Sequence, residues 1–219
     1  MMGFVGQTRA AQLIDTLVSM GIGEATQPWE FPPRRAPWFL DNGAFTYWRK
    51  GVQFDHAGFR RAVELTCGHS VEPAWVTVPD VVADATTTLA WAEAYLPGLR
   101  ALRFRTAIVV QDGMEPETFP FWRDVDVIFV GGSLPWKLTR AAEWCRAAHA
   151  HGKRCHVGRV GSARRVRWAR SIATDSVDSC VPLFSERNLR VWTDALFARS
   201  VQMQLGGWLA PPPTARRGS

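Results

Sequence analysis

The segments AIVVQ at residues 107–111 and VIFVG at residues 127–131 are short apolar runs that end in a polar residue or a glycine. They are too short for a buried helix and rich in β-branched side chains, which is typical of strands buried on both faces. Five further runs share this character: Phe4 to Gly6, Trp38 to Asp41, Trp75 to Pro79, Cys155 to Gly158 and Ser176 to Val181. We therefore predict seven strands.

Segments with the spacing of amphipathic helices separate these strands. They are Thr8 to Met20, Asp55 to Thr66, Asp84 to Leu96, Leu138 to His151, Ser162 to Ile172 and Glu186 to Met203. The alternation predicts a parallel sheet covered by helices, either closed or open. We expect one compact (β/α)8 TIM-type barrel over residues 1–210, irregular or trimmed because no eighth strand can be assigned. Residues 27–37 are expected to form a loop, and residues 211–219 a flexible basic tail.

The composition is that of a globular protein, with 47% hydrophobic residues in a chain of 219. The sequence contains no apolar run of bilayer-spanning length and no signal-peptide pattern, so we expect a cytoplasmic protein. The four cysteines form no CxxC pair, which predicts reduced core thiols and neither a zinc site nor a disulfide framework. They are Cys67, Cys145, Cys155 and Cys180.

The net charge of +6 comes from 23 Arg and only 3 Lys against 20 acidic residues. Arginine binds phosphate with two parallel hydrogen bonds, so this composition is compatible with a polyanionic partner. Codon usage in a GC-rich genome would produce the same replacement of lysine. Arg159, Arg164 and Arg165 surround the start of a predicted helix, where they would hold a phosphate backbone or form a solvated helix face.

Polar residues follow several predicted strands, and catalytic groups of α/β folds gather at the carboxyl ends of strands. These residues are Asp41-Asn42-Gly43, Asp80, Gln111-Asp112-Gly113, Gly131-Gly132-Ser133 and the segment Asp175 to Cys180. Simpler interpretations exist for each. Asn42-Gly43 suits a tight hairpin turn, Asp84 a helix N-cap, and His156 a buried, hydrogen-bonded histidine. Gly158 to Ser162 has only a weak likeness to a phosphate-binding turn.

Taken in order, the motifs Asp41-Asn42-Gly43-Ala44-Phe45, Asp80, Val110-Gln111-Asp112-Gly113, Gly131-Gly132-Ser133 and Asp175-Ser176-Val177-Asp178-Ser179-Cys180 resemble those of the guanine transglycosylase superfamily. The resemblance runs from about residue 38 to about residue 182. The tRNA-modifying members carry a zinc subdomain that has no counterpart here. The resemblance therefore points to the branch that inserts 7-deazaguanine bases into DNA, the deoxypurine-in-DNA protein A family of bacteria and phages.

The resemblance implies a role for each residue of the motifs. Asp178 would be the nucleophile and Asp41 the general acid/base of a double displacement. Asp80 would accept the N1–H and amino group of guanine, while the Gln111 amide and the Gly132 N–H would donate to its O6. The remaining implied contacts are Gly131 and Phe45 at the base, Asp175 as a supporting residue, and Trp48 and Trp136 as stacking surfaces.

The resemblance also implies partners. The target base of double-stranded DNA would be flipped into the pocket, and the free 7-deazaguanine base would be the second substrate. The resemblance does not decide whether a partner protein helps to open the DNA. Neither a metal nor an organic cofactor is expected, because an aspartyl ester conserves the energy of the glycosidic bond. Three alternatives are the same chemistry on RNA or nucleosides, a catalytically silent DNA-binding protein, and an unrelated barrel glycosidase or phosphate-binding enzyme.

Overall fold

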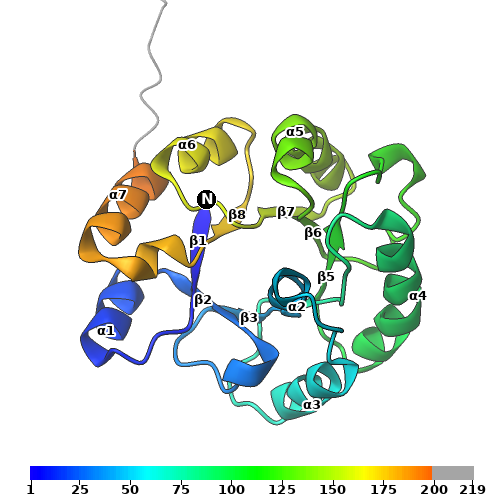
Figure 1. The fold of residues 1–219 in the computed structure, drawn as a ribbon, viewed down its shortest axis with the longest axis horizontal. Coiled ribbons are helices and arrows are strands. Elements are labelled where there is room, and N and C mark those ends of the chain that lie inside the picture. The colour runs from blue at the N-terminus through cyan, green and yellow to red at the C-terminus, as the bar shows by residue number, and fades with distance from the viewer. Residues whose placement is uncertain (199–219) are drawn as a thin grey trace, which may run out of the picture.

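The computed structural model describes residues 1–198, in which eight parallel strands pair in chain order and close into a barrel. The strands are β1 (Met2–Gly6), β2 (Gly23–Thr26), β3 (Trp38–Leu40), β4 (Val76–Thr77), β5 (Thr106–Val110), β6 (Val127–Val130), β7 (Arg154–Val157) and β8 (Ser176–Asp178). Figure 1 shows the ring of strands from one end, with α2 drawn within its outline and the other helices outside it. The predicted TIM-type barrel is confirmed.

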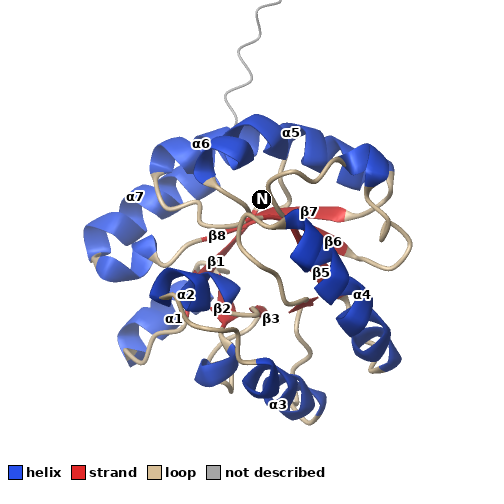
Figure 2. Ribbon diagram, turned by 45° about the vertical axis from the view of Figure 1, so that its right-hand side comes forward, coloured by secondary structure: helices blue, strands red, loops and turns tan. Residues whose placement is uncertain are grey.

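Seven helices accompany these strands. They are α1 (Ala11–Ser19), α2 (Ala44–Lys50), α3 (His56–Cys67), α4 (Ala85–Ala101), α5 (Leu134–Ala150), α6 (Ala163–Ser171) and α7 (Glu186–Phe197). Short 3-10 turns η1 (Pro28–Glu30) and η2 (Pro116–Thr118) follow β2 and β5, and η3 (Val181–Phe184) follows β8. The barrel is thus compact and irregular, with its helices unevenly spaced around the strands (Figure 2).

The strand that was not predicted is β2, which pairs with β1 and β3 and lies between the helix predicted to end at Met20 and the loop predicted from residue 27. Its sequence, GEAT, carries no apolar run, yet all four residues are buried. Glu24 can be buried because Arg35 forms an ion pair with it at 2.9 Å. A strand whose charge is neutralised by a distant residue has no hydrophobic signature, and this explains the omission.

The segment Asp41–Gly43 is not a hairpin turn, because it connects β3 to α2, a helix that was not predicted. Gly43 adopts a φ of 78° immediately before this helix, a conformation that a side chain would strain. The N-cap predicted at Asp84 is confirmed, because Asp84 accepts a hydrogen bond from the Thr87 N–H. Ser162 caps α6 in the same way, by accepting one from the Arg165 N–H. The predicted continuation to Met203 and the tail 211–219 lie outside the described residues.

Aromatic side chains fill the interior of the barrel. Phe4, Phe39, Trp75, Phe129 and His156 pack together there, with Phe39 stacked on Trp75 at a centroid distance of 4.4 Å. A second, larger apolar cluster lies between the strands and the surrounding helices. The aromatic layer occupies the inside of the ring, so a ligand is restricted to the space above it.

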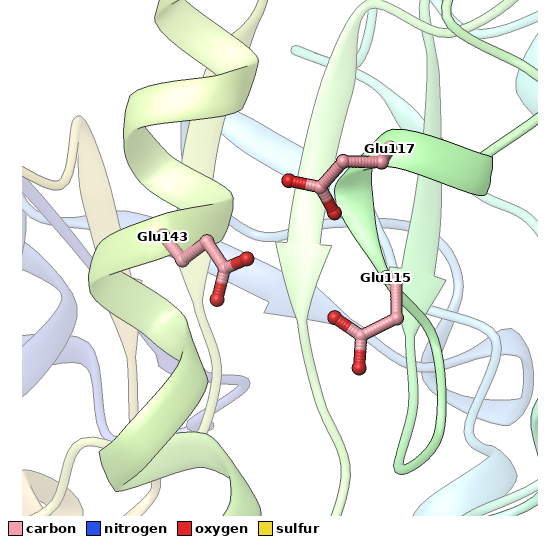
Figure 3. A group of neighbouring side chains, drawn as sticks. All are labelled: Glu115, Glu117 and Glu143. Atoms are coloured by element: carbon pink, nitrogen blue, oxygen red, sulfur yellow. The ribbon is translucent and has the colours of Figure 1, made fainter.

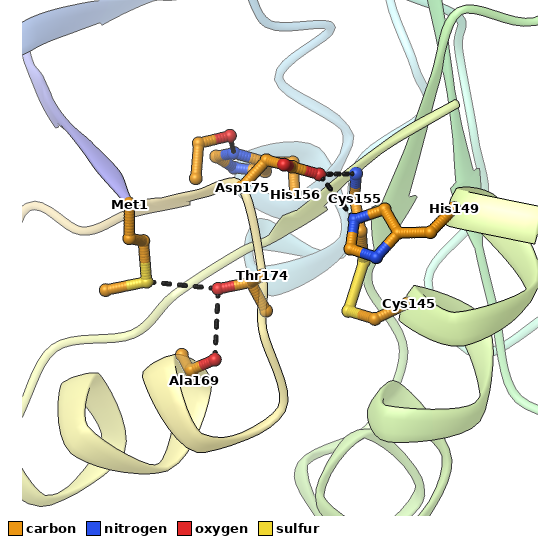
Figure 4. The surroundings of a disulfide bond; sticks show 9 residues. Met1, Cys145, His149, Cys155, His156, Ala169, Thr174 and Asp175 are labelled. Carbon is orange, nitrogen blue, oxygen red and sulfur yellow. Dashed lines mark hydrogen bonds and ion pairs between the residues drawn. A yellow bond between two sulfur atoms is a disulfide. The ribbon is translucent and has the colours of Figure 1, made fainter. Parts of the chain in front are cut away.

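The expectation of four reduced core thiols is wrong. Cys145 of α5 and Cys155 of β7 are fully buried and joined as a disulfide, with Cα atoms 5.2 Å apart (Figure 4). Cys67 and Cys180 are free but exposed. The ten-residue separation of Cys145 and Cys155 forms no recognisable motif, and only the packing of α5 against β7 brings the two sulfurs together.

Within residues 1–198, no helix combines the length and the apolar character needed to cross a membrane.

Candidate active site

A cavity of about 160 Å³ opens at the carboxyl ends of the strands. Val109 and Phe129 contribute apolar surface to it from β5 and β6. Eight of the residues singled out from the sequence line it together: Asp41, Phe45, Asp80, Gln111, Gly131, Gly132, Arg159 and Asp178. They come from six different strand ends, and closure of the barrel brings them to one place.

Asp178 ends β8, and its side chain is 19% exposed. Its Oδ1 accepts hydrogen bonds from the Nε2 of His156 at 3.0 Å and from the Arg159 N–H at 3.2 Å. The buried His156 ring is also paired through Nδ1 with the Ser176 hydroxyl at 2.8 Å. Within the described residues, the side-chain hydrogen bonds of Asp178 all end on Oδ1. Its Oδ2 is therefore the oxygen left for a ligand.

Asp41 follows β3, on another side of the same cavity. Its Oδ2 accepts a hydrogen bond from the Gln27 side-chain amide at 2.6 Å, and its Oδ1 accepts one from the Asn42 N–H at 2.9 Å. Burial raises the pKa of Asp41 to about 6, and the nearby charge of Asp178 acts in the same direction. A carboxyl group with this pKa exchanges a proton near neutral pH, as a general acid/base must.

Asp80 lies in the loop after β4, where its side chain is buried and accepts hydrogen bonds from two side-chain amides. Asn42 donates to its Oδ1 at 2.7 Å, and Gln111 donates to its Oδ2 at 2.5 Å. Burial raises the pKa of Asp80 to about 7, against the opposite effect of the Asn42 and Gln111 hydrogen bonds. The Oε1 of Gln111 accepts from the N–H groups of Gly132 and Ala83, so the Gly132 N–H and one of the two hydrogens of the Gln111 amide are already used within the protein.

The two glycines after β6 allow close packing beside the cavity. A Cβ atom at Gly131 would lie 2.4 Å from Val109 Cγ1 and 3.1 Å from Gln111 Nε2. Gly132 has a φ of 70°, and a Cβ there would lie 2.7 Å from the Trp136 ring. A larger residue at Gly131 would displace Gln111, and one at Gly132 would be strained by its positive φ and would meet Asp112 and Trp136.

Arg159 extends over the cavity from the loop after β7. Its guanidinium lies 4.3 Å from the centre of the Phe45 ring and donates to the Gly132 carbonyl at 2.5 Å. Phe45 stacks in turn on Trp48, whose side chain is 56% exposed and lies outside the cavity lining. Trp48 therefore stands next to the opening, as does Trp136 beside Gly132.

Besides Trp48 and Trp136, three further predicted residues are not part of the cavity lining. Arg164 and Arg165 lie in the first turn of α6, exposed and half-buried respectively. Asp175 precedes β8 and so lies at the opposite end of the barrel from Asp178. It accepts hydrogen bonds from the Cys155 N–H at 2.7 Å and from His149 Nε2 at 2.9 Å, as Figure 4 shows.

Four residues with contacts in the site were given no role from the sequence: Gln27, Asn42, Lys137 and His156. His156 is buried and hydrogen-bonded as expected, but one of its partners is Asp178. Lys137 is 3% exposed and lines the cavity. Burial, followed by the charge of Arg159, lowers the pKa of Lys137 to about 7. A signal existed for Lys137 alone, because it is one of three lysines in an arginine-rich chain.

Three carboxylates elsewhere have oxygen atoms close enough to hold a metal ion. They are Glu115, Glu117 and Glu143, shown in Figure 3. None of them lines the cavity. Arg140 forms ion pairs with Glu115 and with Glu143, so its guanidinium already neutralises two of the three carboxylates.

Comparisons with known proteins support the fold. No protein-family model and no curated protein sequence matches the chain. Many solved structures resemble it. One is tryptophan synthase from M. tuberculosis in an open form, with a TM-score of 0.50 and 12% identity over 89% of this chain and 91% of that one. Another is a putative fructose-1,6-biphosphate aldolase from Coccidioides immitis, with a TM-score of 0.56 and 9% identity over 89% of this chain and 84% of that one. At such identities the likeness concerns the fold alone. The chain is thus a TIM-type barrel, a fold compatible with an enzyme.

Proposed function

We propose that this protein is a guanine transglycosylase that exchanges guanine in DNA for a 7-deazaguanine base, such as 7-cyano-7-deazaguanine, in the cytoplasm. One observation carries the proposal: Asp178, Asp41 and Asp80 line a single small cavity in three different environments. Asp178 has one oxygen without a donor among residues 1–198, Asp41 has a pKa of about 6, and Asp80 is held by two amides. These environments suit a nucleophile, an acid/base and a base-recognition group.

In the first displacement, Oδ2 of Asp178 attacks the anomeric carbon, and the bond from that carbon to the guanine nitrogen breaks. The electron pair leaves with guanine, which takes the proton of Asp41. In the second displacement, Asp41 removes the ring N–H proton of the incoming base, whose nitrogen attacks the same carbon. The ester bond breaks, and the Asp178 carboxylate is restored. Two inversions give retention of configuration.

Base selection would depend on the Asp80 network. Each carboxylate oxygen accepts one protein hydrogen bond and has a second lone pair, so the N1–H and amino group of guanine fit the two oxygens. Gln111 Nε2 has a second hydrogen, which suits the O6 acceptor. Adenine presents an acceptor at N1, so one Asp80 oxygen would face it without a hydrogen from the base. A buried polar group that loses its partner costs about 1–3 kcal/mol, which is enough to discriminate.

The polymer would reach this cavity as a flipped nucleotide, because a duplex hides both the anomeric carbon and the Watson–Crick edge. Arg159 over the cavity, together with Arg164 and Arg165 at the start of α6, supplies positive charge for the neighbouring phosphates. The exposed Trp48 beside Phe45 offers a surface on which a displaced base would stack.

The test is incorporation of radiolabelled guanine into double-stranded DNA, with tRNA in parallel, by wild type and by Asp178→Ala. We expect label in DNA with the wild type and none with Asp178→Ala, whereas Asp124→Asn, an exposed carboxylate paired with Arg100, should retain activity. Label in tRNA alone would transfer the proposal to RNA. Absence of label in both polymers, together with retained DNA binding, would favour a silent DNA-binding protein.

A barrel glycosidase is the second candidate, because Asp41 and Asp178 are near enough for one charge to raise the pKa of the other. It leaves the Asp80, Asn42 and Gln111 network without a role. Release of sugar from an aryl glycoside by wild type, and not by Asp178→Ala, would favour it.

A further inference from the structure

A single peptide bond, between Gly158 and Arg159, links two side chains of the cavity. Its carbonyl oxygen accepts a hydrogen bond from Lys137 Nζ at 2.6 Å. Its N–H donates to Oδ1 of Asp178 at 3.2 Å. The amide is planar and conjugated, so a positive charge at its oxygen makes its N–H a stronger donor. Lys137 and Asp178 are therefore coupled through one rigid group.

Lys137 is an unusual residue for this place. It projects from the first turns of α5, where its side chain is almost fully enclosed, and lysine is seldom buried without a partner. Within residues 1–198, its side-chain hydrogen bond ends on the Gly158 carbonyl. A lysine ammonium is a compact donor, whereas the guanidinium fork of arginine is wider and would need more partners. The chain, which otherwise prefers arginine, has lysine here.

The turn that Lys137 contacts is constrained. Arg159 has a φ of 60°, in the left-handed region that non-glycine residues avoid. A Cβ atom at Gly158 would lie 2.4 Å from Phe129 Cε2 and 3.2 Å from Asp178 Oδ1, so the backbone runs close to both. A hydrogen bond to the Gly158 carbonyl fixes the orientation of the peptide, and with it the direction of the Arg159 N–H.

We propose that Lys137 is a positioning residue, which holds the Gly158–Arg159 peptide so that its N–H binds Oδ1 of Asp178 and leaves Oδ2 to attack. The inference rests on the proposed function for the role of Asp178, but the link itself is a property of the protein alone. His156 donates to the same Oδ1, so the two donors together fix the rotation of the carboxylate.

The charge of Lys137 depends on groups from four neighbouring elements. Burial has the largest effect on its pKa and lowers it; Arg159 of the loop after β7 and Arg165 of α6 lower it further, while Asp178 of β8 and Asp112 of the loop after β5 raise it. The resulting pKa of about 7 means that Lys137 loses its proton as the pH rises through neutrality. The polarisation of the Arg159 N–H should decline over the same range.

The experiment follows two NMR signals of the protein from pH 5.5 to 8.5: the Lys137 Nζ, labelled with 15N, and the backbone amide of Arg159. We expect the chemical shift of the Arg159 amide proton to move upfield as the pH rises, with the same midpoint as the titration of the Lys137 Nζ signal. In Lys137→Met, whose side chain has a similar shape, that step should vanish, while Lys153→Met should retain it. The kcat for base exchange at pH 6 should fall about tenfold in Lys137→Met with KM within about twofold, and Lys137→Arg should recover part of it.

The proposal is overturned if, in wild type, the chemical shift of the Arg159 amide proton does not change as Lys137 Nζ titrates. This measurement does not depend on whether a variant folds. An unchanged kcat in a folded Lys137→Met also overturns it. If the amide follows Lys137 but wild type exchanges no base in DNA or tRNA, the link between Lys137 and Asp178 stands and the proposed function fails.

Discussion

The side-chain amide of Gln111 donates a hydrogen bond to Asp80 at 2.5 Å. Gln111 follows β5 and Asp80 follows β4, which are neighbouring strands of the barrel. The same amide accepts hydrogen bonds from the Gly132 and Ala83 N–H groups through its oxygen. Asn42 donates to the other oxygen of Asp80. The ends of β3, β4, β5 and β6 are thus joined by one buried polar network.

The first prediction concerns stability and pH at Asp80. Its pKa in the folded protein is about 7, above the usual 3.8, because it is buried. Between pH 4 and 7 the folded state keeps a proton that the unfolded state has released, so the free energy of unfolding falls as pH rises through this window. A rise in pKa from 3.8 to about 7 contributes at most about 4 kcal/mol to the free energy of unfolding. Urea unfolding at pH 5 and pH 8 should show a smaller fall in Asp80→Asn than in wild type; equal falls would contradict the assignment.

The second prediction concerns Asp41 as the acid. Its pKa is raised to about 6, so the protonated fraction falls as pH rises above 6. Single-turnover release of guanine should therefore slow by up to about tenfold per pH unit above that value. Asp41→Asn should remove this dependence and lower the rate by roughly 10²–10⁴-fold. Rapid-quench kinetics between pH 5 and 8 measures both, and an Asp41→Asn profile that keeps the wild-type slope would assign the proton to another group.

The third prediction concerns the buried ion pair of β2. Arg35 binds Glu24 at 2.9 Å and donates to the carbonyls of Val5, Gly6 and Gly23. Arg35→Ala leaves Glu24 buried and unpaired, which should lower the free energy of unfolding by about 3–5 kcal/mol. The neighbouring Arg34 is exposed, so Arg34→Ala should change it by no more than about 0.5 kcal/mol. Guanidinium unfolding of both variants measures this, and similar values would show that the pair is not needed.

The fourth prediction concerns the close approach at Gly131. A Cβ atom there would meet Val109 at 2.4 Å and Gln111 Nε2 at 3.1 Å, so Gly131→Ala should displace Gln111 from Asp80. Guanine binding, measured by calorimetry, should weaken by about tenfold or more. Gly98 lies inside α4 with open space at its Cβ, and Gly98→Ala should leave binding unchanged while stabilising the helix by up to about 1 kcal/mol. Unchanged guanine affinity in Gly131→Ala would argue against Gln111 as a base-recognition residue.

The residues of the cavity were found from the sequence to the extent that they follow apolar strands. Asp41, Asp80, Gln111, Gly132 and Asp178 each come within two residues of such a run, and the carboxyl ends of parallel strands meet at one face. The contacts among them were not predictable. The predicted O6 donors turned out to bind groups of the protein, because the partner of an amide depends on side-chain orientation.

The pattern of apolar runs and helical segments determined by itself a parallel sheet covered by helices, because burial on both faces of a strand requires a continuous hydrophobic run. It left open whether the sheet closes, and the structure decided for the barrel. It did not determine β2, whose Glu24 is neutralised by Arg35, or the pairing of Cys145 with Cys155. Nor did it determine Lys137, which reaches Gly158 across 21 residues. These features depend on which segments meet in space, and only the closed barrel decided that.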